Sequence, residues 1–369
     1  MRLASYNVEN LFDRAKAMNL ADPADGDATL ADFAALSVLI NQVVYSDADK
    51  TEMVRLLTTL GLAKSDTGPF ALLRRNRGQL VKRGAAGLTI TANGRSDWVG
   101  GLELRRTPIP AEAMRNTARA IHGVGADVLG IVEVENRPVL RDFMTEVVPA
   151  VGGTPFAHLM VIDGNDERGI DVGLCSRAGF PIGTMRSHVD DADDNGRLIF
   201  SRDCPEYCVT TPAGNRLILL VNHLKSKSGP NQRGNNARRL LQARRVAEIY
   251  NGLIAAGETN IAVLGDLNDT PAAAPLAPLF TDTDLTDAQT HPNFDDGGFP
   301  GTYGSATAAH KIDYILLSPA LFAKVQGGGI YRRGMWPGVR PKKWAVFPEL
   351  KRPEDAASDH AAVFVDLDL

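Results

Sequence analysis

Several short apolar runs of this chain end in a carboxylate, an amide or a histidine. Runs of this length, bounded by turn residues, are typical of buried β-strands. If several strands end at one edge of a sheet, polar residues that are far apart in the sequence meet there. The side chains at these ends are Asn7, Glu133, His223, Asp266 and Asn268, with His360 directly before the last run. Such side chains bind hard metal ions and transfer protons.

The two oxygen donors nearest the N-terminus suggest a metal site. Asn7 follows the run Arg2–Tyr6, and Glu133 follows Val128–Val132. Mg²⁺ prefers carboxylate and amide oxygens and keeps waters in its other positions. For either residue alone, a capping or turn role is an equally good interpretation. A second acid, Glu135, lies two residues after Glu133, so the sequence leaves open which of the two faces a site.

Asp266 and Asn268 follow the clean apolar run 261–265. Strand alternation places the two side chains on the same side. An acid and an amide in this arrangement can hold a water molecule or a phosphate oxygen. The alternative is an Asx turn, in which the aspartate side chain bonds the following backbone.

Two of the seven histidines, His223 and His360, lie beside an apolar run and next to a polar residue. Histidine is the side chain best matched to proton transfer near neutral pH. A carboxylate behind a histidine fixes its tautomer and stabilises its protonated form. Asp171 and Asp313, each at the start of a run, are candidates for this role. For either histidine taken alone, a structural role is the alternative.

Length and composition are those of an ordinary globular protein, with 369 residues, 44% of them hydrophobic and 23% charged. No run approaches the roughly 18–20 apolar residues of a membrane span. The first residues lack the basic start, apolar stretch and cleavage site of a signal peptide. Three cysteines argue against a disulfide framework. We therefore expect a cytoplasmic protein without a membrane segment.

The net charge of −4 neither favours nor excludes a nucleic-acid partner. One segment, 331–352, is nevertheless basic and contains two tryptophans. Its cations and tryptophans are Arg332, Arg333, Arg340, Lys342, Lys343, Lys351, Arg352, Trp336 and Trp344. Lys225, Lys227 and Arg233 add positive charge just past His223. Phosphates attract such cations and bases stack on aromatic rings, so the pattern predicts nucleic acid as a partner. A solvated basic loop is the alternative.

The order of apolar runs predicts two mixed sheets packed face to face, with helices outside. Residues 111–125 and 236–255 have the pattern of helices. About a hundred residues separate the first strand from the helix at 111, which is too long for a plain connection. We therefore expect a single domain, 1–369, with an insertion at 13–110 that contains helices and a β-hairpin around Asn93-Gly94. A lid over the site and a dimer contact are both open roles for it, and the oligomeric state is left open.

The motifs, in their order along the chain, resemble the endonuclease/exonuclease/phosphatase superfamily, which has the deoxyribonuclease I-like fold. The matching pieces are Ser5–Phe12 (SYNVENLF), Val132–Asn136 (VEVEN), Asn222–Ser226 (NHLKS), Gly265–Asn268 (GDLN), Lys311–Tyr314 (KIDY) and Ser358–His360 (SDH). Each motif alone is weak, but six in order are specific. The resemblance covers residues 1–12 and 111–369, and the insertion departs from the family's minimal pattern.

The resemblance implies a four-layer α/β-sandwich that hydrolyses phosphoesters with a divalent metal. Asn7 and Glu133 would bind Mg²⁺, for which Mn²⁺ can substitute. Asp359 would support the metal or the histidine beside it. His360, oriented by Asp313, would act as general base or as a phosphate contact.

The resemblance also assigns the remaining residues. Asp266 and Asn268 would position the attacking water and the phosphate, and His223 would be the second histidine, as in the nuclease branch. Asp171 is the looser match for the carboxylate partner of His223. We expect a nuclease that acts on DNA or RNA by in-line attack of water. The alternatives are a phosphatase or phosphodiesterase acting on a small molecule or lipid headgroup, and a binding module that has lost catalysis.

Overall fold

The computed structural model describes residues 1–9, 11, 13–18, 23–85, 87–108, 111–166, 168–227, 231–339 and 342–369. Contacts within the chain define two compact units. The first comprises residues 1–12, 109–227 and 232–369, and the second comprises residues 13–108 and 228–231. Each unit has its own hydrophobic core, so each is described by itself. No helix among the described residues is long and apolar enough to cross a membrane.

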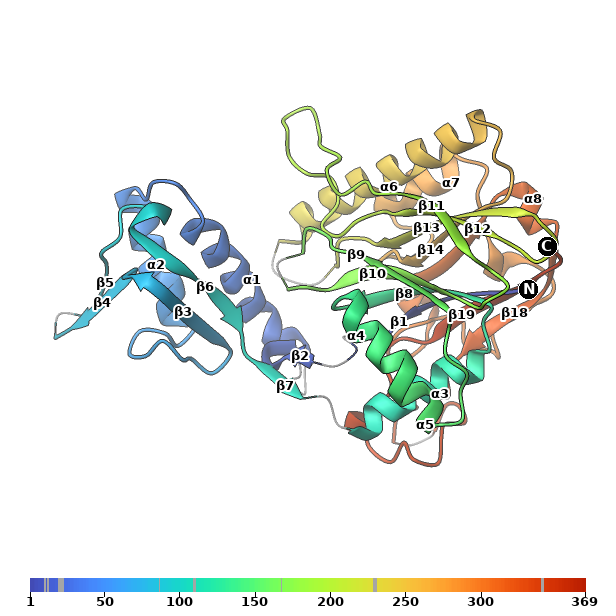
Figure 1. The fold of residues 1–369 in the computed structure, drawn as a ribbon, viewed down its shortest axis with the longest axis horizontal. Helices are drawn as coiled ribbons and strands as arrows, with labels where there is room; N and C mark the ends of the chain where they lie inside the picture. Colours follow the sequence, from blue (N-terminus) through green and yellow to red (C-terminus); the bar gives the residue numbers. More distant parts are fainter. Residues whose placement is uncertain are drawn as a thin grey trace. The chain divides into compact units, whose positions relative to one another are not determined.

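The first unit is built on two mixed sheets (Figure 1). The larger sheet has seven strands, in the spatial order β16 (Phe294–Asp295), β18 (Val325–Tyr331), β19 (Ala362–Leu367), β1 (Arg2–Asn7), β8 (Val128–Val134), β10 (Asp171–Ser176) and β9 (His158–Ile162). The other has six strands, in the order β11 (Ile182–Arg186), β12 (Glu206–Thr210), β13 (Arg216–His223), β14 (Ile261–Asp266), β17 (Asp313–Leu317) and β15 (Thr286–Asp287). In each sheet one central pair is parallel, β1 with β8 and β13 with β14, and its outer neighbours are antiparallel.

The two sheets pack face to face through a core of branched aliphatic side chains. Strand β13 shows how the sequence produces this arrangement. Leu217, Leu219 and Val221 face the other sheet, whereas Ile218 and Leu220 face the helices behind. A continuous apolar run is therefore needed, because both faces of the strand are buried.

Helices cover the outer face of each sheet (Figure 1). The helices on the two sides are α3 (Ala111–Val124), α4 (Arg137–Asp142) and α5 (Val148–Ala150) against the larger sheet, and α6 (Gln232–Ala255) and α7 (Ala277–Thr281) against the smaller one. A short helix, α8 (Pro319–Phe322), follows β17. Gly125, at φ +64°, ends α3 in the left-handed conformation that favours glycine. The predicted four-layer α/β-sandwich is confirmed.

The second unit combines two helices with short strand pairs. Its elements are β2 (Asp13–Ala15), α1 (Pro23–Ile40), α2 (Asp47–Thr59), β3 (Ala71–Gly78), β4 (Val81–Gly84), β5 (Gly87–Ile90), β6 (Trp98–Leu104) and β7 (Arg106–Pro108). Trp98 is fully buried among leucines of α2 and β3, and its indole nitrogen donates to the hydroxyl of Tyr45 at 2.9 Å. This core gives the unit a packing centre of its own.

The predicted hairpin turn at Asn93-Gly94 is wrong. Strand β5 pairs with β4, and β6 pairs with β3, so the strands flanking the dipeptide do not pair with each other. The glycine is used for a close approach instead, because a Cβ on Gly94 would lie 2.0 Å from the carbonyl oxygen of Val43. Asn93 accepts from the amide of Tyr45 at 2.8 Å. A tertiary contact has replaced the local turn preference of this sequence.

Candidate active site

The predicted site residues lie at one edge of the two packed sheets. Strands β1, β13 and β14 end at this edge with Asn7, His223 and Asp266. The antiparallel strands β10 and β17 begin there with Asp171 and Asp313. Because parallel neighbours end together where antiparallel neighbours start, side chains from five separate stretches of sequence share one edge.

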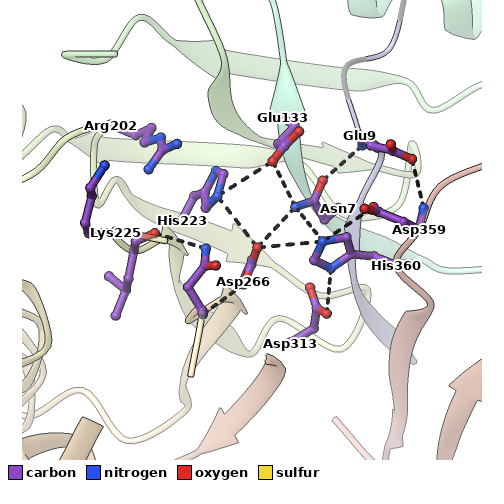
Figure 2. A network of polar contacts seen from close by, with 12 residues as sticks. Asn7, Glu9, Glu133, Arg202, His223, Lys225, Asp266, Asp313, Asp359 and His360 are labelled. Carbon is purple, nitrogen blue, oxygen red and sulfur yellow. Dashed lines mark hydrogen bonds and ion pairs between the residues drawn. The ribbon is translucent and has the colours of Figure 1, made fainter. Parts of the chain in front are cut away.

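The centre of the site is the carboxylate of Asp266 (Figure 2). Its Oδ2 lies 3.2 Å from Nδ2 of Asn7, 3.6 Å from Nε2 of His223 and 4.0 Å from Nε2 of His360. Oε1 of Glu133 completes the group, 3.3 Å from Nδ2 of Asn7 and 3.7 Å from Nε2 of His223. The site thus has one imidazole on each side of an amide and two carboxylates.

A β-bulge brings Glu133 into this group. The register of β8 against β10 skips one residue, so that Asp171 pairs with Val134 and Val172 pairs with Val132. Glu133 is the extra residue and has φ +65°, in the left-handed region that non-glycine residues rarely adopt. Bulges re-aim side chains, and strained backbone of this kind clusters at functional sites.

His360 is held in place by Asp313. Nδ1 of His360 lies 2.8 Å from Oδ2 of Asp313, which also accepts a hydrogen bond from Oγ1 of Thr302 at 2.6 Å. Burial opposes a charge on His360, but the carboxylates of Asp313 and Asp359 outweigh it and raise the pKa of His360 well above its usual value. With Nδ1 engaged, only Nε2 is left to face the centre of the site. The structure therefore brings together the predicted pair.

His223 has the opposite environment. Burial and then the cations Arg202 and Arg168 lower the pKa of His223 well below its usual value. Its predicted partner is not beside it: Nδ1 of His223 is buried without a hydrogen bond to any described residue. Asp171 instead accepts from the amide of Gly164 at 2.8 Å. The bulge explains this arrangement. Asp171 pairs with Val134, whereas the bulged residue, Glu133, is the one whose side chain approaches His223.

Asp266 and Asn268 form the Asx turn that the sequence offered as an alternative. Oδ1 of Asp266 accepts from the amide of Asn268 at 2.8 Å, and Asn268 has φ +57°. Nδ2 of Asn268 donates to the carbonyl of Leu224 at 3.1 Å, which ties the ends of β14 and β13 together. The turn uses Oδ1 only, so Oδ2 of Asp266 still points to the site centre. Burial and the nearby carboxylate of Asp313 raise the pKa of Asp266.

Asp359 lies on the other side of His360, where its Oδ1 is 3.6 Å from Nε2 of the imidazole. Its backbone amide donates to Oε2 of Glu9 at 2.9 Å. The amide of Glu9 in turn donates to Oδ1 of Asn7 at 3.0 Å. Glu9 belongs to the first sequence motif, but sequence reasoning did not assign it a role. It adds a further carboxylate beside Asp359 (Figure 2).

The donor set fits a divalent cation. Glu133, Asp266 and Asp359 supply carboxylate oxygens, the hard donors that such ions prefer, and Nδ2 of Asn7 faces the first two of these carboxylates. One trio, Asp266, Asp313 and His360, has ligand atoms within 4.8 Å of one another. Since Nδ1 of His360 is already bonded to Asp313, that trio also contains the histidine–carboxylate pair described above.

Sequence reasoning missed a buried basic group at the His223 end of the site. Arg202 is 2% exposed, and its Nε lies 2.9 Å from Oδ2 of Asp166. Arg239, 0% exposed, joins Asp269 at 2.6 Å and donates to the carbonyl of Lys225 at 2.7 Å. Neither arginine follows an apolar strand, so the strand-end pattern did not reveal them. One weak signal could have indicated that Arg239 is buried: it lies on the same face of α6 as the buried residues Gln242 and Val246.

Part of the predicted nucleic-acid segment is used inside the fold. Arg332 is buried and donates to the carbonyls of Asp296 and Phe299 and, at 2.9 Å, to that of Gly301. Trp344 packs edge-on against Phe299 at 5.5 Å between ring centroids. These two side chains are therefore not a stacking or phosphate-binding surface.

Other members of segment 331–352 differ in their environment. Arg333 and Lys351 are exposed, and Lys342 is exposed as well. Lys343 donates to the carbonyl of Ser305 at 2.9 Å. Arg340 lies outside the described residues. The exposed cations give this segment a basic surface that is smaller than the sequence predicted.

Two packed mixed sheets, covered by helices and carrying acids and histidines at one edge, define an α/β-sandwich hydrolase. Residues 107–294, just over half of the chain, match the Endonuclease/Exonuclease/phosphatase family. The chain belongs to this family and is an enzyme of its metal-dependent phosphoesterase type. No curated protein matches the chain in sequence.

Solved structures resemble the chain in fold. An endonuclease/exonuclease/phosphatase from Bacteroides vulgatus has 19% identity and a TM-score of 0.50, over 69% of this chain and 90% of its own. A Bacteroides thetaiotaomicron mannosyl-6-phosphatase has 17% identity and a TM-score of 0.49, over 70% and 92%. The human nocturnin catalytic domain with bound sulfate has 15% identity and a TM-score of 0.44, over 69% and 85%. At these identities the likeness concerns the fold.

Proposed function

We propose that the protein is a phosphodiesterase that hydrolyses DNA or RNA by in-line attack of a water molecule. The observation that carries this proposal is the placement of two imidazoles on either side of one carboxylate. Nε2 of His223 and Nε2 of His360 lie 3.6 Å and 4.0 Å from Oδ2 of Asp266. In-line displacement needs one group for the attacking water and another for the leaving oxygen, on opposite sides of the phosphorus.

The metal would be held by Glu133, Asn7 and Asp359, with Asp266 close by. When bound, a divalent ion neutralises phosphate charge and stabilises the charge that develops in displacement. Mg²⁺ is our proposed ion because all the donors are oxygens, and Mn²⁺ would replace it. Glu133 suits a ligand position because its bulge fixes the direction of the side chain independently of the strand.

Each remaining side chain has a proposed task. His360, held at Nδ1 by Asp313, contacts the phosphate on the leaving side and donates the Nε2 proton to the leaving oxygen as the P–O bond breaks. His223 presents a neutral Nε2 that can accept the proton of the attacking water. Asp266 orients that water through Oδ2, and Asn268 keeps Asp266 in place through the Asx turn. Acid and base groups of this kind each contribute about 10²–10⁴-fold to rate.

Nucleic acid is favoured as the substrate by the cations near the site. Lys225 and Lys227 follow His223 directly, and Arg233 is exposed at the start of α6. Arg333, Lys342 and Lys351 remain exposed in segment 331–352. Phosphate binding by such cations makes affinity fall steeply with salt. The second candidate, a phosphatase or phosphodiesterase for a small molecule or lipid headgroup, is favoured by the internal use of Arg332 and Trp344.

A substrate panel tests the proposal. Plasmid DNA, RNA, an abasic duplex, bis-p-nitrophenyl phosphate and p-nitrophenyl phosphate are each incubated with Mg²⁺, Mn²⁺ or EDTA. We expect cleavage of a nucleic acid and of the small diester, with either metal, and none in EDTA. The variant His360→Ala should stay folded and lose most activity, whereas Arg244→Gln, an exposed position on α6, serves as the control. Cleavage of the monoester alone would favour the phosphatase, and diester cleavage in EDTA would refute the metal assignment.

A further inference from the structure

The His223 end of the site contains two cations that have no assigned task in the chemical step. The guanidinium group of Arg202 and the side chain of Lys225 both lie at this end (Figure 2). Arg202 is 2% exposed, and among the described residues its only partner is Asp166, 2.9 Å from Nε. Its two Nη groups donate to no described residue. Lys225 is half-buried, and its ammonium group has no partner among the described residues either.

An arginine in this position needs an explanation. A buried charge is costly unless it is paired and its hydrogen bonds are satisfied. The carboxylate that pairs with Arg202 within the described part of the chain, Asp166, is shared, because the same Oδ2 lies 2.7 Å from Nη2 of Arg168. Two guanidinium groups therefore share one carboxylate. Burial, and then the nearby charges of Arg202 and Arg168, lower the pKa of Lys225.

The surrounding structure holds these cations in place. The amide of Lys225 donates to Oε1 of Gln242 at 2.8 Å, and its carbonyl accepts from Nη1 of Arg239 at 2.7 Å. Both partners are fully buried. Gly164 lets the chain before β10 pass close to Arg202, because a Cβ there would lie 2.8 Å from the Cα of Arg202. Such support from buried neighbours is typical of a preorganised binding site.

We propose that Arg202 and Lys225 form an anion subsite that binds a second phosphate group of the substrate, next to the phosphoester that is cleaved. Resting on the proposed phosphodiesterase activity, this inference specifies the substrate class as a molecule with at least two phosphates. A guanidinium group binds phosphate oxygens through two parallel N–H donors, and both Nη groups of Arg202 are open for this. The ammonium group of Lys225 would add a point charge.

Matched small substrates test this subsite. The first is the p-nitrophenyl phosphodiester of thymidine; the second carries a terminal phosphate on the other sugar hydroxyl, and the third carries a methyl phosphodiester there. The leaving group is the same in all three, so the ratio of kcat/KM values reports only the added phosphate. For the unmodified protein with Mg²⁺, we expect kcat/KM of a substrate with the added phosphate to be about 10 to 100 times that of the substrate without it. A gain with both phosphorylated compounds indicates a strand backbone, and a gain with the second alone indicates a terminal phosphate.

Two variants and a control complete the design. Arg202→Gln should bring the ratio close to one, and Lys225→Gln should reduce it severalfold. Arg244→Gln, which removes an exposed arginine of α6, should keep the ratio of the unmodified protein. If Arg202→Gln fails to fold by circular dichroism, Lys225→Gln decides the question, and an unchanged ratio in it overturns the subsite.

The outcomes also separate this inference from the proposed function. If the unmodified protein cleaves none of the three diesters, the phosphodiesterase assignment fails. If it cleaves them without preference, or if the preference survives in Arg202→Gln, only the second-phosphate subsite fails. A further readout needs no turnover: calorimetric binding of inorganic pyrophosphate in EDTA should be at least about tenfold weaker in Arg202→Gln.

Discussion

The pairing of His360 with Asp313 gives the sharpest prediction. The variant Asp313→Asn keeps the size of the side chain and the contact with Thr302 but removes the negative charge 2.8 Å from Nδ1 of His360. Without that charge, the imidazole is no longer stabilised in its protonated form, although the amide oxygen that keeps the contact with Thr302 can still accept from Nδ1–H. We therefore expect the proton to leave His360 at neutral pH.

The expected loss follows from the role of the imidazole. General acid–base groups contribute about 10²–10⁴-fold, so kcat should fall by this range, or about 2.7–5.4 kcal/mol in activation free energy. A hydrogen bond to a charged group contributes about 1.5–3 kcal/mol to stability, and Asp313 is 1% exposed. The variant should therefore unfold at a lower temperature but remain folded at 25 °C.

Steady-state kinetics on bis-p-nitrophenyl phosphate with Mn²⁺ measures the loss, and circular dichroism checks the fold. Thr302→Val is the matched control, since it removes the other hydrogen bond to Oδ2 of Asp313 and leaves the carboxylate. The double variant Asp313→Asn/His360→Gln is the decisive comparison. If Asp313 acts through His360, the double variant loses no more activity than His360→Gln alone. Additive losses, or a folded Asp313→Asn protein with more than a third of normal kcat, would refute the reasoning.

Three further predictions concern stability and metal binding. Burial and nearby carboxylates raise the pKa of Asp171 to about 7 from 3.8, so the folded protein loses stability as pH rises through this window, by roughly 4 kcal/mol at most. The variant Asp171→Asn keeps the acceptor for the amide of Gly164 and should abolish this loss, which urea unfolding at pH 4 and pH 8 measures. Equal pH profiles for the two proteins would contradict this. Glu133→Gln should weaken Mn²⁺ binding by at least about 100-fold in calorimetry, and Glu146→Gln should not; equal affinities would exclude Glu133 as a ligand. We propose that the insertion 13–110 folds around its own core, so Trp98→Ala should lower its unfolding free energy by about 3–5 kcal/mol, and an unchanged calorimetric profile would rule this out.

Much of the site could be read from the sequence because the strand ends are explicit in it. Continuous apolar runs identify strands buried on both faces, and the first polar residue after each run marks the sheet edge. This reasoning located Asn7, His223 and Asp266, which end strands β1, β13 and β14. Glu133 was located in the same way, but the bulge that aims it was not visible, since a skipped register depends on the partner strand.

The parts that the sequence did not reveal depend on long-range packing. Arg202 lies in an irregular segment and becomes significant only because Asp166 and His223 are brought beside it. Composition also cannot separate a surface cation from one that serves the fold, and Arg332 was counted with the basic surface for that reason. The same limit applies to Asn93-Gly94, where the contact with Val43 is absent from any local pattern.

The charges of the site are divided between its two ends. Carboxylates of Glu9, Asp313 and Asp359 gather around His360, whereas Arg202 and Lys225 lie beyond His223 (Figure 2). The acidic end of the site repels an extended polyanion unless a bound cation neutralises the carboxylates. The basic end attracts the polyanion whether or not a metal ion is bound. A bound divalent ion would therefore draw only the scissile phosphate toward the acidic end. Under the proposed function, the rest of a polyphosphorylated substrate would extend past His223 toward Arg202 and Lys225, so the separation of charges within the site would set the direction in which the substrate binds.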